Sequence, residues 1–433
     1  MSAVARTRTR AGKRPAEASD PPGTEARRAA LGLVDAVLRK GLPLEAALGA
    51  TAKLERPDDR AFALAIASEV LRRLPDLDAL IDSATQKKLP DDAKARGVLR
   101  IALVQALRMG TPPHAAIATA LPLVDKGPRR LVHGVFGALM RKGAVLPEPP
   151  ALPSKVAMRW DGAWGGEMLA AAERAMAVPP PLDICFAPER PPELEGISFM
   201  PGHLRVPRGQ AVPGMTGFGE GGWWVQDVAA SVPARLLGLG EGRTALDLCA
   251  APGGKTMQLA AAGFEVTAVD ASESRLERLR ENLARTRLEA GVVAADLMSW
   301  APPAPVDAIL LDAPCSATGI FRRHPDVLHR VRPKAIAELA GAQAAMLARV
   351  ADWLKPGGTL VYSVCSIEPE EGEQVAAAFL HDRPDFVIAP PRADEIIPGM
   401  EPSPGGWLRL LPPLLEDQGG ADSFFIMRVR RGG

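Results

Sequence analysis

Three short segments of this 433-residue chain place chemically capable side chains directly after apolar runs. The first, Asp247–Thr256, reads Asp-Leu-Cys-Ala-Ala-Pro-Gly-Gly-Lys-Thr. The other two each carry a cysteine, Cys315 within Asp-Ala-Pro-Cys-Ser and Cys365 within Tyr-Ser-Val-Cys-Ser. A cysteine thiolate is strongly nucleophilic and can also act as a leaving group, so a pair of such thiols suits covalent addition followed by release.

The glycine-containing segment is predicted to be a turn between a buried strand and a helix. Glycines let backbone approach a ligand closely, and the amides at a helix N-terminus attract negative charge. A phosphate-binding P-loop would require glycine at position 249, where this chain has Cys249, and the dinucleotide fingerprint Gly-x-Gly-x-x-Gly is absent. The turn therefore supports neither ATP nor NAD as the ligand.

Acidic residues accompany the ends of three predicted strands. Asp247 precedes the glycine turn, Asp270 follows 23 residues later at the end of the next strand, and Asp296 comes after the third. A carboxylate at the end of the second strand, such as Asp270, can accept hydrogen bonds from both ribose hydroxyls of an adenosine ligand. One after the third strand, such as Asp296, can accept a hydrogen bond from the adenine amino group. Capping of the following helix is the structural alternative for Asp270. Three such acids in succession favour an adenosyl ligand.

The thiols and carboxylates together indicate methyl transfer to a pyrimidine. Carbon-5 of cytosine is a poor nucleophile until a thiolate adds to carbon-6 and makes the ring enamine-like. An aspartate hydrogen-bonded to the ring nitrogen can support that addition, and a base must later remove the carbon-5 proton. Cys315 and Cys365 are both candidates for the attack. Cys185 and Cys249 are expected to be small buried side chains, and the absence of Cys-x-x-Cys pairs predicts no zinc site.

Alternating strands and helices are predicted to position these groups. The predicted strands are 244–248, 265–269, 292–294, 307–311 and 358–363, the intervening helices are 255–261, 272–287 and 335–354, and Trp407–Leu411 and Ser423–Val429 form a final antiparallel pair. Such alternation indicates an α/β fold with a mixed, mostly parallel sheet covered by helices on both faces. Ligands of these folds bind at the carboxyl ends of the strands.

The first third of the chain is predicted to be an all-α bundle. Phe62, Ile66, Val70 and Leu74 recur every four residues, as on the buried face of a helix. The net charge of +1 conceals an asymmetry, because residues 1–147 hold 25 Lys/Arg and 15 Asp/Glu whereas the remainder holds 27 and 36. This basic balance favours contact with a polyanion, although solvated helix faces would give it as well.

The three chemical segments resemble the S-adenosylmethionine-dependent RNA cytosine-5 methyltransferases. Residues 25–142, with Asp59-Arg-Ala-Phe, Leu71-Arg-Arg-Leu and Pro112-Pro-His-Ala, resemble a NusB-like domain that binds RNA or a protein partner. The combination looks like the RsmB (Sun/Fmu) type, with a Rossmann-like class I methyltransferase domain after the helical bundle. The resemblance implies that S-adenosylmethionine is held by Cys249, Ala250, Ala251, Pro252, Gly253, Gly254, Lys255, Asp270, Asp296 and Asp312.

The resemblance also assigns roles to the thiols. In RNA enzymes of this family the later cysteine attacks, which makes Cys365 the nucleophile and Cys315 the residue that assists release; in a DNA-type enzyme Cys315 would attack instead. Asp312 would face both the cofactor and the base. Arg322 and Arg323 are expected either to contact RNA as a lid or to lie in a solvated loop. Trp223 and Trp224 are expected either to stack on bases or to pack in the core.

The predicted domain order is a disordered basic tail at 1–22, the NusB-like domain at 23–147, a linker with a small α/β RNA-binding subdomain at 148–240 and the methyltransferase domain at 241–433. No apolar run long enough for a membrane helix or a signal peptide is present, so a cytoplasmic protein is expected. It is also expected to be a monomer and to act on RNA, not DNA. Small-subunit ribosomal RNA is the leading substrate. Transfer RNA, or a non-catalytic role in assembly or antitermination, remains an alternative.

Overall fold

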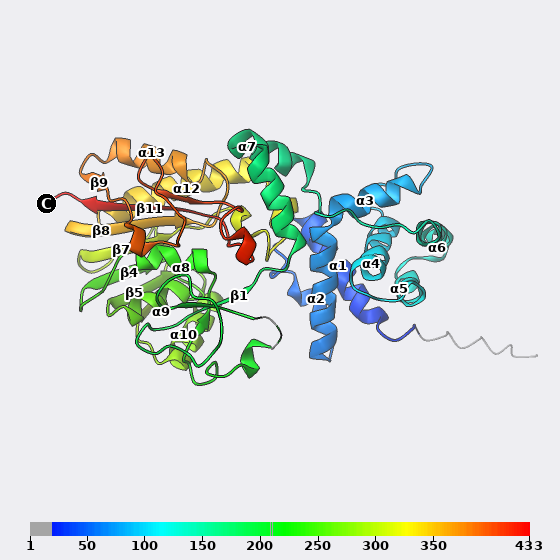
Figure 1. Cartoon of the computed structure of the whole chain (residues 1–433), viewed down its shortest axis with the longest axis horizontal. Helices are drawn as coiled ribbons and strands as arrows, with labels where there is room; N and C mark the ends of the chain where they lie inside the picture. Colours follow the sequence, from blue (N-terminus) through cyan, green and yellow to red (C-terminus); the bar gives the residue numbers. More distant parts are fainter. Residues whose placement is uncertain (1–19, 208, 210) are drawn as a thin grey trace, which may run out of the picture.

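The protein divides into a helical part and an α/β part, seen at the right and left of Figure 1. This computed structural model describes residues 20–207, 209 and 211–433. Residues 1–19 of the predicted basic tail therefore lie outside the described residues. None of the described helices combines the length and apolar character that a membrane crossing requires.

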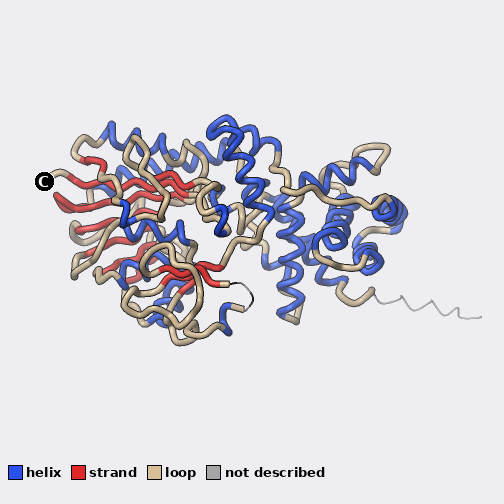
Figure 2. Tube along the Cα trace, in the orientation of Figure 1, coloured by secondary structure: helices blue, strands red, loops and turns tan. Residues whose placement is uncertain are grey.

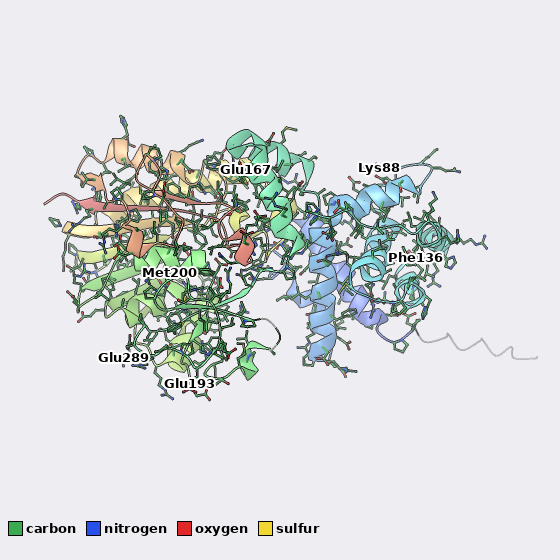
Figure 3. The ribbon with its side chains drawn as sticks, in the orientation of Figure 1. Lys88, Phe136, Glu167, Glu193, Met200 and Glu289 are labelled. Atoms are coloured by element: carbon green, nitrogen blue, oxygen red, sulfur yellow. The ribbon has the colours of Figure 1, made fainter. Side chains whose placement is uncertain are left out.

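The helical part packs six α-helices around one apolar core, as predicted. The helices are α1 Thr24–Lys40, α2 Pro57–Arg72, α3 Leu74–Ser83, α4 Lys94–Arg108, α5 Pro113–Ala120 and α6 Lys126–Arg141, with 3₁₀ turns η1 Leu48–Thr51 and η2 Leu121–Leu123. Ile66 and Val70, two of the four apolar residues with four-residue spacing, are fully buried on α2. Phe136 of α6 packs in the same core (Figure 3).

A long helix that the sequence did not indicate lies between the two parts (Figures 1 and 2). This helix, α7 Ser154–Ala177, is interrupted at Gly165, whose φ of 81° is left-handed. Glycines in its middle lower helix propensity and obscure the apolar period, which explains why the sequence did not reveal it. A small antiparallel sheet follows, in the order β2-β1-β3, with β1 Leu182–Cys185, β2 His203–Val206 and β3 Trp224–Val225, and η3 Val212–Gly214.

The main sheet confirms the predicted strands. Its strands are β4 Thr244–Leu248, β5 Glu265–Asp270, β6 Gly291–Ala294, β7 Val306–Asp312, β8 Leu354–Val364, β10 Leu408–Leu410 and β11 Phe424–Arg431, in the order β10-β11-β8-β7-β4-β5-β6, while β9 Phe386–Ile388 pairs with β11. The five strands from β6 to β8 are parallel, and β11 is antiparallel to β8. The strand order reverses direction at β4, which makes the crevice between β4 and β7 the expected ligand site.

Helices cover both faces of this sheet. The helices are α8 Val228–Arg235, α9 Gly254–Ala261, α10 Glu273–Thr286, α11 Val327–Arg330, α12 Pro333–Ala351 and α13 Glu373–Asp382, with η4 Thr318–Ile320, η5 Ala393–Glu395 and η6 Glu416–Gln418. Ile309 and Leu311 of β7 pack in the same core as α12 and α13, whereas Ala308 and Leu310 pack with α8 and α9. Both faces of β7 are thus buried, which accounts for its continuous apolar sequence.

Candidate active site

The turn after β4 is held in a shape that depends on its sequence. Cys249 has a left-handed φ of 61°, and Gly253 has a φ of 102°. A Cβ atom at Gly253 would lie 2.9 Å from Cγ of Leu279 on α10, so both the backbone angle and the space require glycine. The Asp270 carboxylate at the end of β5 accepts a hydrogen bond from the Ala251 amide at 3.1 Å. The turn is therefore fixed from the neighbouring strand.

A cavity of about 450 Å³ opens beside this turn, at the carboxyl ends of the strands. Its wall includes these predicted site residues: Cys249, Ala250, Ala251, Pro252, Gly254, Lys255 and Asp312. Gly253, Asp270 and Asp296 are not among the residues that line it. Asp270 Oδ2 accepts from the Ala251 amide and its Oδ1 from the Ser272 amide just before α10, as the capping alternative predicted. Asp296, which follows β6, is exposed and accepts from the Met298 amide. The volume is in the range of small-molecule sites.

Asp247 at the floor of this cavity fits a ligand that donates hydrogen bonds. Its Oδ2 accepts from the Thr256 hydroxyl at 2.5 Å, whereas its Oδ1 is buried with no protein partner. Burial raises the pKa of Asp247 to about 7, partly offset by the Thr256 hydrogen bond. A buried acceptor without a donor needs water or a ligand, and the amino group of S-adenosylmethionine is such a donor. The residues present therefore fit this cofactor.

Lys255 and Asp312 form an ion pair on the cavity wall. Lys255 Nζ donates to Asp312 Oδ2 at 2.7 Å, and the Ser363 hydroxyl of β8 donates to Asp312 Oδ1 at 2.7 Å. Burial alone lowers the pKa of Lys255, but the adjacent Asp312 carboxylate more than offsets it and the net pKa is raised. Lys255 thus stays an ammonium, 5.5 Å from the centre of the Phe424 ring.

The structure brings the two predicted reactive thiols into contact. The sulfur atoms of Cys315 and Cys365 are 3.4 Å apart, although 50 residues separate them in sequence. Asp312 and Ser363 are paired in register on β7 and β8, so the loops that follow these neighbouring strands must begin side by side. Both thiols are partly exposed. The pKa of Cys315 is raised well above its usual value, first by its hydrogen bond with Cys365 and then by burial.

The other two cysteines differ from this pair. Burial raises the pKa of Cys249 to about 12, and burial likewise raises the pKa of Cys185. A thiol that keeps its proton is a weak nucleophile and behaves as a small apolar side chain. Cys249 therefore contributes backbone shape and packing to the cavity wall.

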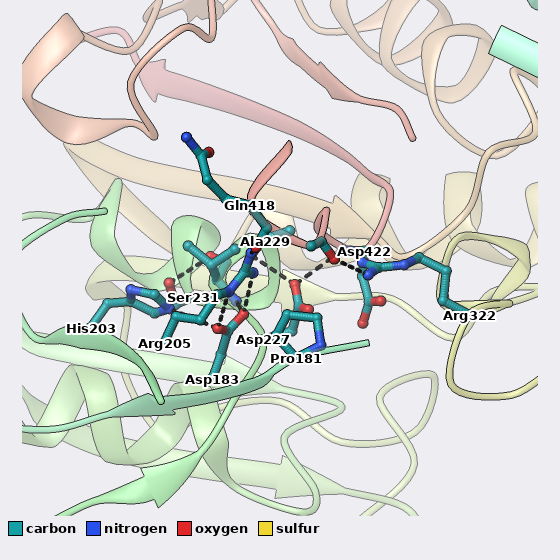
Figure 4. A network of polar contacts seen from close by, with 12 residues as sticks. Pro181, Asp183, His203, Arg205, Asp227, Ala229, Ser231, Arg322, Gln418 and Asp422 are labelled. Atoms are coloured by element: carbon teal, nitrogen blue, oxygen red, sulfur yellow. Dashed lines mark hydrogen bonds and ion pairs between the residues drawn. The ribbon is translucent and has the colours of Figure 1, made fainter. Parts of the chain in front are cut away.

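The prediction that Arg322 faces RNA or solvent is wrong. Its side chain is only 2% exposed and donates to the Gly419 carbonyl, next to a network of buried charges (Figure 4). Arg323 lines the cavity but is paired with Asp227 at 2.6 Å and Asp422 at 3.1 Å. Both arginines are therefore held by contacts with segments remote in sequence: Arg323 pairs with Asp227 and Asp422, and Arg322 donates to the Gly419 carbonyl.

The same network accounts for the small sheet. Asp183 on β1 accepts two hydrogen bonds from Arg205 on β2, at 2.7 and 2.8 Å, and one from the Val228 amide that begins α8. Trp223 and Trp224 are buried, so the core-packing alternative holds for both. Asp227 and Asp422 were not predicted as site residues. The sequence signal was weak, because an isolated aspartate before a helix reads as a cap, and Asp227 indeed caps α8 through the Ala229 amide.

The sheet is doubly wound, a glycine turn lies at its crossover point, and the cavity beside that turn contains the unpaired Asp247 oxygen. These features define an S-adenosylmethionine-dependent methyltransferase. The chain is 35% identical over 388 residues to the ribosomal RNA small subunit methyltransferase B of Klebsiella pneumoniae subsp. pneumoniae, covering 81% of this chain and 88% of that one. It is 33% identical over 414 residues to the protein of the same name from Vibrio cholerae, covering 88% and 94%. The chain belongs to this family, the ribosomal RNA small subunit methyltransferases B.

Sequence profiles agree with this assignment, and solved structures share the fold. The profile described as 16S rRNA methyltransferase RsmB/F matches residues 234–430, and the NusB family profile matches residues 24–142. A crystal structure of the protein PH0851 shares the fold over 95% of this chain and 99% of its own, with a TM-score of 0.72 and 22% identity. A methyltransferase homologue from Pyrococcus horikoshii, at 26% identity, matches 68% of this chain and 98% of its own with a TM-score of 0.52.

Proposed function

We propose that this enzyme methylates carbon-5 of a cytosine in 16S ribosomal RNA through a covalent bond between Cys365 and the base. The observation that carries the proposal is the 3.4 Å contact between two thiols beside the Lys255–Asp312 pair. Addition and release act on neighbouring ring atoms, so the groups responsible must reach one base together. The names of the family and of its curated members support ribosomal RNA as the substrate.

The family resemblance assigns the attack to Cys365, the later of the two thiols. The 3.4 Å contact between the two sulfur atoms would let the Cys315 thiol hydrogen-bond to Cys365 when Cys365 is a thiolate. A hydrogen bond to a thiolate stabilises the charged form, which is the form that attacks. Cys365 then adds to carbon-6 of the base. The Asp312 carboxylate, held in place by the Lys255 ammonium, would accept a hydrogen bond from the ring nitrogen as that nitrogen takes up a proton from water during the addition.

The cavity walls hold the methyl donor during this step. Residues Cys249 to Lys255 would cradle it, with Asp247 accepting from its amino group. The family resemblance assigns its adenosine end to Asp270 and Asp296, which follow the next two strands. When bound, S-adenosylmethionine supplies a methyl group on a sulfonium, which the activated carbon-5 takes up.

Release follows from the loss of charge on Cys365. Once Cys365 is bonded to carbon, the negative charge and hydrogen bond that raised the pKa of Cys315 are gone, and that pKa falls. Cys315 can then lose its own proton to water and, as a thiolate, accept the proton leaving carbon-5. The electrons of that C–H bond re-form the ring double bond and expel Cys365 as a thiolate.

Denaturing gels with substrate RNA test these assignments. Cys315→Ala should accumulate a covalent RNA–protein adduct, because attack proceeds and release does not, whereas Cys365→Ala should form none. An adduct that persists without Cys365 would reverse the two roles.

The substrate is tested separately. Bisulfite sequencing of total RNA with and without the gene should show one lost 5-methylcytosine in 16S rRNA; loss in transfer RNA would redirect the proposal. A purely RNA-binding role predicts no tritium transfer from labelled S-adenosylmethionine to any RNA. An enzyme of this kind would work as a monomer in the cytoplasm, with the NusB-like domain contacting RNA or a partner.

A further inference from the structure

A buried carboxylate lies directly behind the two thiols. Glu371, in the loop before α13, has no exposed surface. Within the described residues, no lysine or arginine forms an ion pair with it. Burying an uncompensated carboxylate is costly, so its hydrogen bonds must replace the water it has lost.

Those hydrogen bonds come from the loops of both cysteines. Ser316, which follows Cys315, donates its amide to Glu371 Oε1 at 2.8 Å and its hydroxyl to Oε2. Ser366, which follows Cys365, donates its hydroxyl to the same Oε2 at 2.6 Å. One oxygen atom therefore joins the residues that follow the two thiols.

Helix α12 and strand β8 also hold Glu371 in place. Gln343 of α12 donates to Glu371 Oε1 at 3.0 Å and also to the Pro314 carbonyl, just before Cys315. The Tyr362 hydroxyl of β8 donates to the Glu371 main-chain carbonyl at 2.6 Å. Four donors thus face the carboxylate, and its backbone is fixed as well. An acceptor-only group surrounded by donors has one arrangement, which is what a rigid support requires.

We propose that Glu371 is a positioning residue that sets the separation of Cys315 and Cys365 through Ser316 and Ser366. This inference rests on the proposed function, in which both thiols act on one base. Glu371 touches neither substrate nor cofactor. Its negative charge also lies close enough to Cys315 to disfavour a thiolate there. The carboxylate thereby supports both the geometry and the division of roles between the two thiols.

The two serines predict unequal defects, although their hydroxyls also lie 3.2 Å apart. Ser366 belongs to the attacking loop, so Ser366→Ala should slow adduct formation more than release. Ser316 belongs to the releasing loop, so Ser316→Ala should slow release more than adduct formation. Glu371→Gln should impair both steps, since a displacement of about 1 Å in a reacting group can cost roughly 100-fold in rate. A residue needed only for folding would not divide the steps in this way.

Two RNA probes separate the steps. A 16S rRNA transcript containing 5-fluorocytosine reports attack alone, because fluorine cannot leave as a cation and the adduct persists. The unmodified transcript reports turnover, and adduct that accumulates on it reports slow release. Glu395→Gln is the control, since Glu395 is also a buried carboxylate but forms its hydrogen bonds outside the two thiol loops, with Arg428 donating to it at 2.9 Å.

We expect kcat of Glu371→Gln to fall about 100-fold relative to Glu395→Gln, with KM for RNA within about twofold. Ser366→Ala should form the fluorinated adduct about tenfold more slowly, and Ser316→Ala should accumulate adduct on unmodified RNA. The pH midpoint for alkylation of Cys315 by iodoacetamide should move lower in Glu371→Gln, because a nearby negative charge is lost. A purely structural glutamate would not move that midpoint.

Several results would overturn the proposal. Unchanged kcat in folded Glu371→Gln would do so, as would serine variants with the same defect in both steps. If Glu371→Gln does not fold, the two serine variants decide the question by themselves. Wild-type protein that forms no adduct on the fluorinated transcript would refute the covalent mechanism first, and this proposal with it.

Discussion

The helical part and the thiol-bearing edge of the sheet both bury charged groups, but they use them differently. In the helical part, Arg96 and Arg100 are buried and donate to Asp78 at 2.8–3.0 Å, with Asp82 and the Leu89 carbonyl completing the set for Arg96. Each charge there has an opposite charge. At the sheet edge, Asp247 keeps an oxygen without a partner.

This contrast separates structural charges from functional ones. A buried ion pair whose donors are all occupied can hold two helices together but has nothing left to offer a ligand. The unpaired oxygen of Asp247 and the touching thiols retain bonding capacity that a substrate or cofactor can use. Part of the positive charge of residues 1–147 is therefore structural and is not available to bind RNA.

The largest expected effect is at the thiol edge. Cys365→Ala should reduce methyl transfer by more than ~10⁴-fold, since removal of a catalytic nucleophile leaves only binding and electrostatic effects. Its thermal stability should stay close to that of the wild type. Radiolabelled methyl incorporation measures the loss. Cys185→Ala, which removes a buried thiol outside the site, should retain activity. Equal losses of methyl transfer in both variants would contradict a catalytic role for Cys365.

The next largest effect is a loss of kcat at Lys255, and a lysine at the other end of β7 provides the comparison. Lys255→Met should lower kcat by about 10²–10³-fold, because a preorganised charge beside the reacting base is lost. Lys355 forms a similar ion pair with Asp307, at 2.9 Å, near the opposite end of β7. Lys355→Met should keep kcat within about twofold of the wild-type value. Steady-state kinetics on RNA distinguishes them, and similar kcat values for the two variants would contradict a special role for Lys255.

A stability effect is expected where the charges are structural. Asp78→Ala should lower the free energy of unfolding by about 3 kcal/mol, since two buried guanidinium groups lose their shared partner. Urea denaturation measures the change. The exposed Asp92→Ala is the control, with an expected change within about 0.5 kcal/mol. Activity per folded molecule should be preserved in both variants, and a selective loss of kcat in Asp78→Ala would connect this network to catalysis.

The smallest effect concerns pH. Burial raises the pKa of Asp247 from 3.8 to about 7, so the folded protein holds a proton that the unfolded chain has already lost. Its contribution to stability is therefore present below pH 4 and declines as pH rises to about 7. Relative to the wild type, Asp247→Asn should gain about 2 kcal/mol between pH 5 and pH 8. Denaturation series of the cofactor-free proteins at each pH measure this.

Asp307 provides the opposite case for that measurement. Its pKa is lowered to about 2, first by the hydrogen bond from Lys355. The stability it contributes is present above pH 4 and is lost only as pH falls toward 2. Asp307→Asn should therefore show no trend relative to the wild type between pH 5 and pH 8. A common trend in both variants would mean that the trend does not come from Asp247, and no trend in Asp247→Asn would contradict the raised pKa of that carboxyl.

Local patterns revealed much of the fold. Apolar strands, the glycine turn and four-residue periodicity depend on neighbouring residues, so the all-α bundle and seven strands of the main sheet were predicted correctly, whereas the short strand β9 was not predicted. The helix α7 was missed because glycines within it interrupt the pattern. Arg322 was misplaced for a different reason: an arginine in a polar loop is usually exposed, and its burial depends on segments about 100 residues away.

The sequence by itself determined which chemistry is possible, because residue type and position within a strand or turn fix the reactive groups and their place at the sheet edge. Only the tertiary structure decided their relations to one another. Cys315 and Cys365 meet because β7 and β8 are hydrogen-bonded in one register, and Glu371 contacts both loops because the segment before α13 lies beside them. Such distances depend on packing between remote segments, which no local pattern encodes.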